Sequence, residues 1–388
     1  VSYTYTSDGK TLRTTYASGR WRENAYNAKR ELVSTEYSDC ETTAFAYDEF
    51  SREVLVSNSV ALVTLARNTY GQITNETASV DGEMYSLDRE FDAYGRIVAN
   101  DGSACAYDSA GRLASISNAI AVAEYQYSND GLDAGYSITL SNEVVFTRSV
   151  ARDGYRRSLV TNIVNSAAGT TVEFLNYAYD ALNRPISRNT DTFGYNDRSE
   201  VTSATIAGIA DGYGYDEIGN STYWTPNSLN QYTEFTYDLD GNLLSDGVHT
   251  YTYDAANHLK TVSTNGVIIL TISYDAKSRR VKKVTPEATT TFFYDDWDLI
   301  EERIAYTNGT TSTLHYYWGK DLSGTLQGAG GVGGLLYLTI DGAIYVPCYD
   351  ANGNITRYLD STGNTVALYT YDAFGNIIFK SGPLADFF

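Results

Sequence analysis

A short motif recurs along this chain, and its spacing restricts the folds that the chain can adopt. Residues 235–243 and 251–259 share an aromatic residue, Tyr two positions later, then Asp, and Gly or Asn three positions after the Asp. From residue 180 onward, successive copies lie 16, 20, 22, 16, 21 and 20 residues apart. This period is too short for helix-turn-helix repeats and favours hairpins with about eight residues per strand. With the Asp position as marker, the copies are at Asn27, Asp48, Asn68, Asp92, Asp108, Ser128, Asp180, Asn196, Asp216, Asp238, Asp254, Asp275, Asp295, Asp350 and Asp372.

The residues around each marker predict a strand followed by a tight turn. Aromatic residues two positions apart, such as Tyr213 and Tyr215, lie on one face of a strand but would diverge on a helix. The Asp side chain can accept hydrogen bonds from nearby backbone amides, and Gly or Asn tolerates positive φ. Arg30 and Ser278 stand where Gly is expected. The predicted turn residues are Asp180, Asp216, Gly219, Asp238, Gly241, Asp254, Asp275, Asp295, Asp350, Gly353, Asp372 and Gly375.

The composition indicates an all-β chain. Among 388 residues there are 35 Tyr, five Pro and one Met, and residue types that favour strands and turns dominate. Many short strands must bury an aromatic face without leaving long exposed edges. Either stacked hairpins wind into a spiral sheet, or the chain divides into sandwiches.

The repeated Tyr-Asp-x-x-Gly-Asn/Arg unit resembles the YD repeat of bacterial RHS proteins, toxin-complex C subunits and animal teneurins. Residues 316–336, followed by the turns at Asp350 and Asp372, are similar to the start of the RHS repeat-associated core domain. The resemblance implies β-hairpins that wind as a spiral sheet into an open or partial hollow shell. It also implies a repeat array over 1–300 and a truncated core domain over 301–388. The residues of the core-domain signature are Trp318, Gly319, Asp321, Leu322, Gly324, Gly330, Gly331, Gly333 and Gly334.

The net charge excludes two classes of partner. The formal net charge of −20 repels a phosphate backbone and an anionic membrane surface, so we expect neither nucleic acid nor membrane as a partner. No apolar run approaches the length of a membrane span. The chain begins at Val1 without Met or a signal sequence, and we expect it to be a fragment. The only basic cluster is Arg148, Arg152, Arg156 and Arg157, which we expect to pair with turn acids.

Several motifs superficially suggest cofactors. Residues 328–333 match the dinucleotide fingerprint Gly-x-Gly-x-x-Gly, but residues 335–340 read as a strand, where that fingerprint requires a helix. Residues 238–242 and 295–298 resemble calcium loops but lack the spacing of an EF-hand. Cys40, Cys105 and Cys348 lack metal spacing, and Cys105 is expected to be a small core residue. His249, His258 and His315 match no catalytic motif. The sequence therefore predicts no cofactor, no metal and no catalytic residue.

The resemblance implies a non-catalytic shell of an RHS-type secreted or contact-dependent toxin. Its partner would be a C-terminal effector segment that is absent from this chain, and its location would be secreted or cell-surface. The self-cleaving chemistry of RHS core domains lies in a segment beyond the end of this chain. The alternative is a cell-surface adhesion module that binds glycans or a receptor through rows of Tyr. Rings turned between layers favour the shell, and an exposed aromatic stripe favours adhesion. A third hypothesis is an enzyme that acts through turn carboxylates, but no pair of these acids stands out in the sequence as catalytic.

Overall fold

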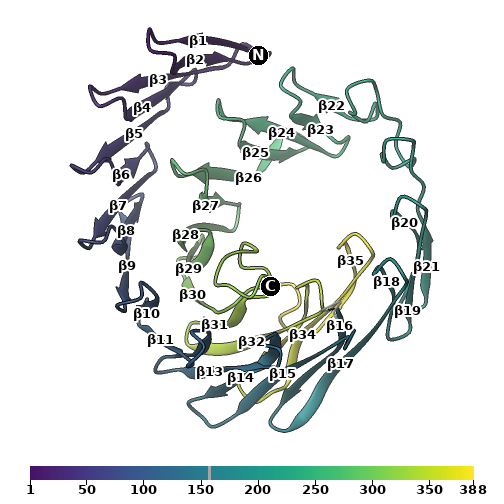
Figure 1. The fold of residues 1–388 in the computed structure, drawn as a ribbon. Coiled ribbons are helices and arrows are strands. Elements are labelled where there is room, and N and C mark those ends of the chain that lie inside the picture. Colours follow the sequence, from purple (N-terminus) through teal and green to yellow (C-terminus); the bar gives the residue numbers. More distant parts are fainter. Residues whose placement is uncertain (156–158) are drawn as a thin grey trace. The chain divides into compact units, whose positions relative to one another are not determined.

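A computed structural model describes residues 1–155 and 159–388 of the protein. The described residues contain strands and turns and no helix, so none of them forms a helix that could cross a membrane. The strands belong to two antiparallel sheets, one formed by β1–β21 and the other by β22–β35 (Figure 1).

The strands of the first sheet are β1 (Ser2–Tyr5), β2 (Thr11–Thr15), β3 (Trp21–Tyr26), β4 (Leu32–Tyr37), β5 (Thr42–Tyr47), β6 (Glu53–Ser57), β7 (Ala61–Arg67), β8 (Ile73–Val80), β9 (Glu83–Phe91), β10 (Ile97–Asn100), β11 (Ser103–Tyr107), β12 (Leu113–Ser117), β13 (Ala121–Tyr127), β14 (Asp133–Leu140), β15 (Val145–Arg152), β16 (Val160–Ala167), β17 (Thr170–Tyr179), β18 (Pro185–Arg188), β19 (Asp191–Tyr195), β20 (Val201–Ile206) and β21 (Ile209–Gly212). Those of the second are β22 (Thr236–Tyr237), β23 (Leu243–Ser245), β24 (His249–Tyr253), β25 (Leu259–Thr264), β26 (Val267–Tyr274), β27 (Arg280–Val284), β28 (Ala288–Asp295), β29 (Asp298–Tyr306), β30 (Thr311–Trp318), β31 (Leu335–Ile340), β32 (Ala343–Tyr349), β33 (Ile355–Asp360), β34 (Thr365–Tyr371) and β35 (Ile377–Ser381).

Consecutive strands pair as antiparallel hairpins. In β13 and β14, for example, the register runs from Ala121 opposite Leu140 to Tyr127 opposite Asp133. A register shift occurs at the Tyr that precedes a marker, as between Thr252 and Tyr253. Such a bulge is expected where a residue with positive φ closes a turn. The repeat thus sets both the turn and the local irregularity of the strand before it.

The chain forms two compact units, each assembled from distant segments. Unit 1 contains residues 1–90, 224–295 and 301–313. Within it, strands β1–β9 face strands β22–β28 (Figure 1). Val56, Val63 and Leu65 form a buried cluster on the first sheet, against which Ala276 of the second sheet packs. The Asn58 side-chain amide, from the first sheet, donates to the Tyr274 carbonyl oxygen over 2.8 Å.

Unit 2 contains residues 91–223, 296–300 and 314–388. Its core includes an apolar cluster drawn from both sheets: Ile138, Leu140 and Phe146 come from the first, and Leu336 and Leu359 from the second. Cys105 is half-buried against this cluster. The predicted boundary at residue 300, between the repeat array and the core domain, stays a prediction. The two units group segments that pack together, which is a different criterion from the sequence repeat.

Candidate functional site

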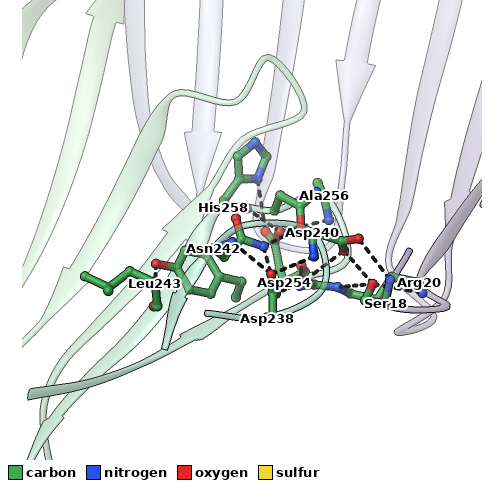
Figure 2. A network of polar contacts seen from close by, with 11 residues as sticks. Ser18, Arg20, Asp238, Asp240, Asn242, Leu243, Asp254, Ala256 and His258 are labelled. Carbon is green, nitrogen blue, oxygen red and sulfur yellow. Dashed lines mark hydrogen bonds and ion pairs between the residues drawn. The ribbon is translucent and has the colours of Figure 1, made fainter. Parts of the chain in front are cut away.

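The repeated turn is the most regular polar structure in the chain, and Asp238 shows its geometry. One carboxylate oxygen of Asp238 accepts from the amides of Asp240, at 2.9 Å, and Asn242, at 2.8 Å (Figure 2). The other oxygen accepts from the Asn242 side-chain amide at 2.9 Å. Gly241 has φ of 91°, a conformation that a residue with a Cβ rarely adopts. The carboxylate therefore closes the loop between two strands.

The same two amide bonds form at the other predicted turn positions except one. In each case the carboxylate accepts from the amides two and four residues later, with the residue at the fourth position supplying a side-chain donor as well. These residues are Asp180, Asp216, Asp254, Asp275, Asp350 and Asp372. Gly219, Gly353 and Gly375 have positive φ, as do Arg30 and Ser278.

Hydrogen bonds from these amides favour the ionised carboxylate. The Arg184 amide lowers the pKa of Asp180, and the Arg112 amide does the same for Asp108. Asp246 lies in the turn between β23 and β24, at the other end of the strands from the repeated turns. It accepts from the His249 amide and the Tyr251 hydroxyl, and these bonds lower its pKa to about 2. Asp108, Asp180 and Asp246 are thus anions that stabilise their turns.

Asp295 differs from the predicted turn geometry. It is the last residue of β28, and the turn that follows consists of Asp296 and Trp297. Its carboxylate accepts from the Arg89 guanidinium, which also lies 3.7 Å from Glu76. Arg279 lies 3.6 Å from the same Glu76 carboxylate and 2.8 Å from Asp275. Asp295 therefore belongs to a buried ion-pair network that connects the two sheets of unit 1. The repeat pattern could not reveal this role. The sequence that leads to the turn, Tyr followed by Asp, is the same whether a longer repeat turn or a two-residue turn comes next.

At most markers, the preceding Tyr fixes one repeat to the one before it. The Tyr253 hydroxyl donates to the Leu243 carbonyl oxygen over 2.9 Å, and Leu243 lies five residues after Asp238. Arg67 and Arg152 replace Tyr, and each donates from its guanidinium to the equivalent carbonyl, that of Glu53 and of Asp133. The position thus favours a hydroxyl or guanidinium donor. Phe91, before Asp92, has none, and the Tyr237 hydroxyl accepts from the Tyr232 amide instead. The tyrosines that donate to a carbonyl are Tyr26, Tyr47, Tyr107, Tyr127, Tyr179, Tyr195, Tyr215, Tyr253, Tyr274, Tyr294, Tyr349 and Tyr371.

Turns of the two sheets also bind each other in unit 1 (Figure 2). The Arg20 guanidinium pairs with Asp238, with Asp240 at 3.0 Å, and donates to the Asp254 carbonyl oxygen over 3.0 Å. The Ser18 amide donates to Asp240 over 2.9 Å. The Asp240 side chain is only 4% exposed. Asp240, at the tip of its turn, therefore binds the turn of the first sheet that contains Ser18 and Arg20. Sequence spacing gave no sign that these turns, more than 200 residues apart, would meet.

The core-domain signature forms a compact loop between β30 and β31. Asp321 is 5% exposed and begins the same kind of turn: its amide donates to the Thr325 carbonyl, and the Gly324 amide donates to the Asp321 carbonyl. Its carboxylate accepts from the amides of Ser323, Ala329 and Gly331. Burial alone would raise the pKa of Asp321, but hydrogen bonds from the Ser323 hydroxyl and from these amides outweigh it and lower the pKa.

The remaining signature residues shape this loop. The Trp318 indole donates to the Leu299 carbonyl oxygen over 2.7 Å, and Leu322 is half-exposed. Gly330, Gly331 and Gly333 have positive φ. A Cβ on Gly331 would lie 2.4 Å from the Asp298 carboxylate. The Gly319 amide donates to the carbonyl of Gly334, which closes the loop. As predicted, the strand β31 follows the Gly-x-Gly-x-x-Gly segment, so the helix that a dinucleotide needs is not formed by these described residues.

Some turns escaped the sequence pattern. Asn227, Asp360, Tyr16 and Tyr37 each begin a turn closed by the same backbone bonds as Asp238. Asn227 and Asp360 lack a preceding Tyr, and Tyr16 and Tyr37 lack the carboxylate. A search for Asx followed three residues later by Gly or Asn would have found the first two.

Side chains of catalytic type have structural partners. His258 lies 3.0 Å from Asp254 and stacks on the Tyr274 ring, and His249 lies 2.7 Å from the Thr264 hydroxyl. The three cysteines are free. Across residues 1–155 and 159–388, His, Cys, Asp and Glu form no group that could hold a metal ion. Arg148 donates to the carbonyls of Tyr349 and Asp350, while Arg156 and Arg157 lie outside the described residues.

Comparison with known families agrees with this geometry. The family described as Teneurin YD-shell matches residues 130–388, which is more than half of the chain. This match confirms the resemblance inferred from the repeats and from the core-domain signature.

Curated relatives cover about half of the chain. A tRNA3(Ser)-specific nuclease WapA of Bacillus spizizenii is 30% identical over 214 residues, 54% of this chain and 8% of that protein. A tRNA nuclease WapA of Bacillus subtilis is 31% identical over 214 residues, which again are 54% of this chain and 8% of that protein. The chain therefore spans less than a tenth of the relatives it matches.

Solved structures share the fold. A crystal structure of TcdB2-TccC3 without its hypervariable C-terminal region matches 98% of this chain and 24% of that chain, with TM-score 0.78 and 14% identity. A Photorhabdus luminescens Tc holotoxin pore matches 97% and 23%, with TM-score 0.74 and 15% identity. The predicted fold class, an all-β array of YD-repeat hairpins, is confirmed.

Proposed function

Because this chain belongs to the teneurin YD-shell family, we propose that it forms part of the wall of a bacterial toxin shell that encloses a polypeptide effector. The wall itself is structural. It acts by excluding other molecules from a confined chain, and the effector lies outside the residues of this chain.

The use of the tyrosines is the observation that carries this proposal. The twelve tyrosines named above donate their hydroxyls to backbone carbonyls. Tyr349, for example, binds the Leu335 carbonyl over 2.9 Å and is 2% exposed. A ring held in this way packs between strands and is not a free platform for a ligand. Rings that pack between strands suit a wall and are not accessible for stacking on glycans.

The relatives suggest what kind of protein contains such a wall. The matched WapA proteins are named as tRNA nucleases, and this chain covers 8% of each of the two described above. By analogy, the proposed cargo is a toxic effector of the longer protein, and the proposed location is secreted or cell-surface. Nuclease activity belongs to those relatives and is not assigned to the residues of this chain.

Protease protection tests this proposal. The natural full-length protein is digested with proteinase K at increasing urea concentrations while strand content is followed by circular dichroism. We expect the effector segment to stay intact until the wall unfolds, and then to be cleaved at the same urea concentration. Cleavage of the effector in buffer, with the strands still folded, would show that the wall does not enclose it.

A second candidate function rests on a different set of rings. Tyr70, Tyr94 and Tyr223 are 80–88% exposed, and Tyr70 and Tyr94 are the second residues after their turn markers. Exposed aromatic side chains of this kind are available to stack on sugars. Binding of the purified chain to a glycan array, lost when Tyr70 and Tyr94 are changed to Ser, would favour the adhesion module. A blank array supports the wall alone.

A further inference from the structure

A cavity of about 620 Å³ in unit 2 lies along the turn edge of strands β12–β16, opposite the loop at 320–333. Two loop contacts form one side of it. The Lys320 amide donates to the Tyr125 hydroxyl over 3.0 Å, and the Lys320 ammonium lies 2.7 Å from the Asp133 carboxylate. A Cβ on Gly319 would lie 2.0 Å from the Tyr125 hydroxyl, so Gly at this position permits the close approach. The cavity is thus formed by the core-domain signature packing on the first sheet.

The charge of this cavity is opposite to that of the chain. Its described lining contains four cations, Arg112, Arg148, Arg152 and Lys320, and two acids, Asp133 and Asp321, which gives a net charge of +2. The chain as a whole carries −20. The Asp321 carboxylate is already bound by backbone amides, so it opposes an incoming anion less than its charge suggests. Arg112 is also paired with Asp108, which lies outside the lining, at 2.7 Å, so the local positive excess is about one charge. A cleft with positive charge on an acidic protein favours anionic ligands.

Aromatic rings separate the cations. The Lys320 ammonium lies 4.7 Å from the centre of the Tyr125 ring and 4.4 Å from that of Tyr127. The Arg112 guanidinium also lies against the Tyr127 ring, 4.1 Å from its centre. Tyr107 and Tyr136 also line the cavity. A ligand here meets apolar ring surface between positive groups.

The spacing of the cations distinguishes between anions. Arg112 precedes β12 and Arg152 ends β15, three strands away, which at about 4.8 Å per strand places them roughly 14 Å apart. A single phosphate reaches at most a neighbouring pair such as Arg112 and Lys320, which both contact the Tyr127 ring, so a ligand that also contacts Arg152 must be longer. An extended peptide rises about 3.4 Å per residue, so about four residues span it.

From these observations we propose that the cavity binds an extended acidic peptide segment of about four residues, with carboxylates facing the cations and an apolar side chain on the Tyr rings. The inference deepens the proposed function, because such a segment would anchor the enclosed effector to the wall. It does not depend on enclosure, since the cavity can bind a free peptide.

Calorimetry on the complete chain tests this inference with defined probes. We expect the peptide acetyl-Asp-Phe-Glu-Asp-amide to bind at least tenfold more tightly than acetyl-Asn-Phe-Gln-Asn-amide at low salt, with the difference shrinking as salt is added. Lys320→Met should weaken binding of the acidic peptide about fivefold. Asp133→Asn should strengthen it several-fold, because it removes a competing carboxylate, and a purely structural role of Asp133 would not produce tighter binding.

Arg198→Gln is the matched control, because Arg198 belongs to the same unit but lies on another turn and outside this cavity. It should leave peptide affinity unchanged. If Lys320→Met does not fold, Arg152→Gln takes its place, with an expected threefold loss. Equal affinity for the acidic and neutral peptides, tighter binding of inorganic phosphate than of the acidic peptide, or weaker binding in Asp133→Asn would each overturn the inference. Effector protection by the wall could still hold in all three cases.

Discussion

Removing the carboxylate of Asp350 should reveal how much a single turn contributes. Asp350 is 1% exposed and accepts from the amides of Asn352, at 2.9 Å, and Asn354, at 3.0 Å. Its other oxygen accepts from the Asn354 side chain and from Arg188 at 3.2 Å. In Asp350→Ala, two amides and the side-chain donors lose their acceptor inside a buried turn.

The expected cost follows from these contacts. Each buried group left unpaired costs about 1–3 kcal/mol, and breaking a buried ion pair on one side costs about 3–5 kcal/mol in total. Because Arg188 keeps Asp191 at 3.0 Å, we expect a loss of about 3–5 kcal/mol and not more. Asp350→Asn keeps the oxygen that accepts both amides, but its NH2 group would face the Arg188 and Asn354 donors. It should therefore lose less than Asp350→Ala, about 1–3 kcal/mol. The chain already uses this solution at Asn196, whose side-chain oxygen accepts from two amides at 3.0 Å.

Urea unfolding followed by circular dichroism measures these losses, and hydrogen exchange measures their location. In Asp350→Ala, the amides of Asn352 and Asn354 should exchange much faster. The Gly353 amide, which donates to the Asp350 carbonyl and not to its side chain, should change less. If Asp350→Asn is destabilised as strongly as Asp350→Ala, the charge facing Arg188 stabilises the turn and the amide bonds do not, which would refute the reasoning.

Three further predictions concern the tyrosines, the acids and one glycine. Tyr349→Phe should cost about 1–2 kcal/mol in urea unfolding, because it leaves the Leu335 carbonyl without its donor, whereas Tyr155→Phe, at an exposed ring, should cost nothing. The lowered pKa values of turn acids such as Asp108 mean that their stabilisation is present above the unfolded pKa near 3.9 and is lost as pH falls through the folded pKa; a urea midpoint that stays constant from pH 5 to pH 2 would contradict this. Gly319→Ala should lower the melting temperature, since its Cβ would overlap the Tyr125 hydroxyl, while Gly309→Ala meets no neighbour and should cost only its positive φ.

The turns could be predicted from sequence because their chemistry is local. An Asp, a residue that tolerates positive φ three positions later and a polar side chain at the fourth position lie within five residues. The structure shows the same loop at positions such as Asp180 and Asp254. Asp295 shows the limit of this reasoning, because a strand can also end at Tyr-Asp and continue into a shorter turn.

Contacts between distant repeats could not be predicted. Nothing in the residues around Arg20 identifies Asp238 or Asp240 as its partners, because every turn offers similar acids. Which turns meet depends on how the two sheets pack, and that is a property of many strands together. The cavity beside Lys320 was missed for the same reason: its cations come from separate repeats, and they become neighbours only after folding.

The bond from each Tyr hydroxyl to the preceding repeat has a consequence for how such chains change length. Donor and acceptor occupy fixed places in adjacent repeats, so a duplicated or deleted whole repeat restores the same bond at the new junction. A gain or loss of one or two residues between a turn and this bond instead moves the carbonyl out of reach, whereas the separation along the chain from carbonyl to Tyr already ranges from 10 to 19 residues. Natural variation in chain length should therefore occur in complete repeats, and odd insertions should gather at the opposite ends of the strands, where this bond is not made.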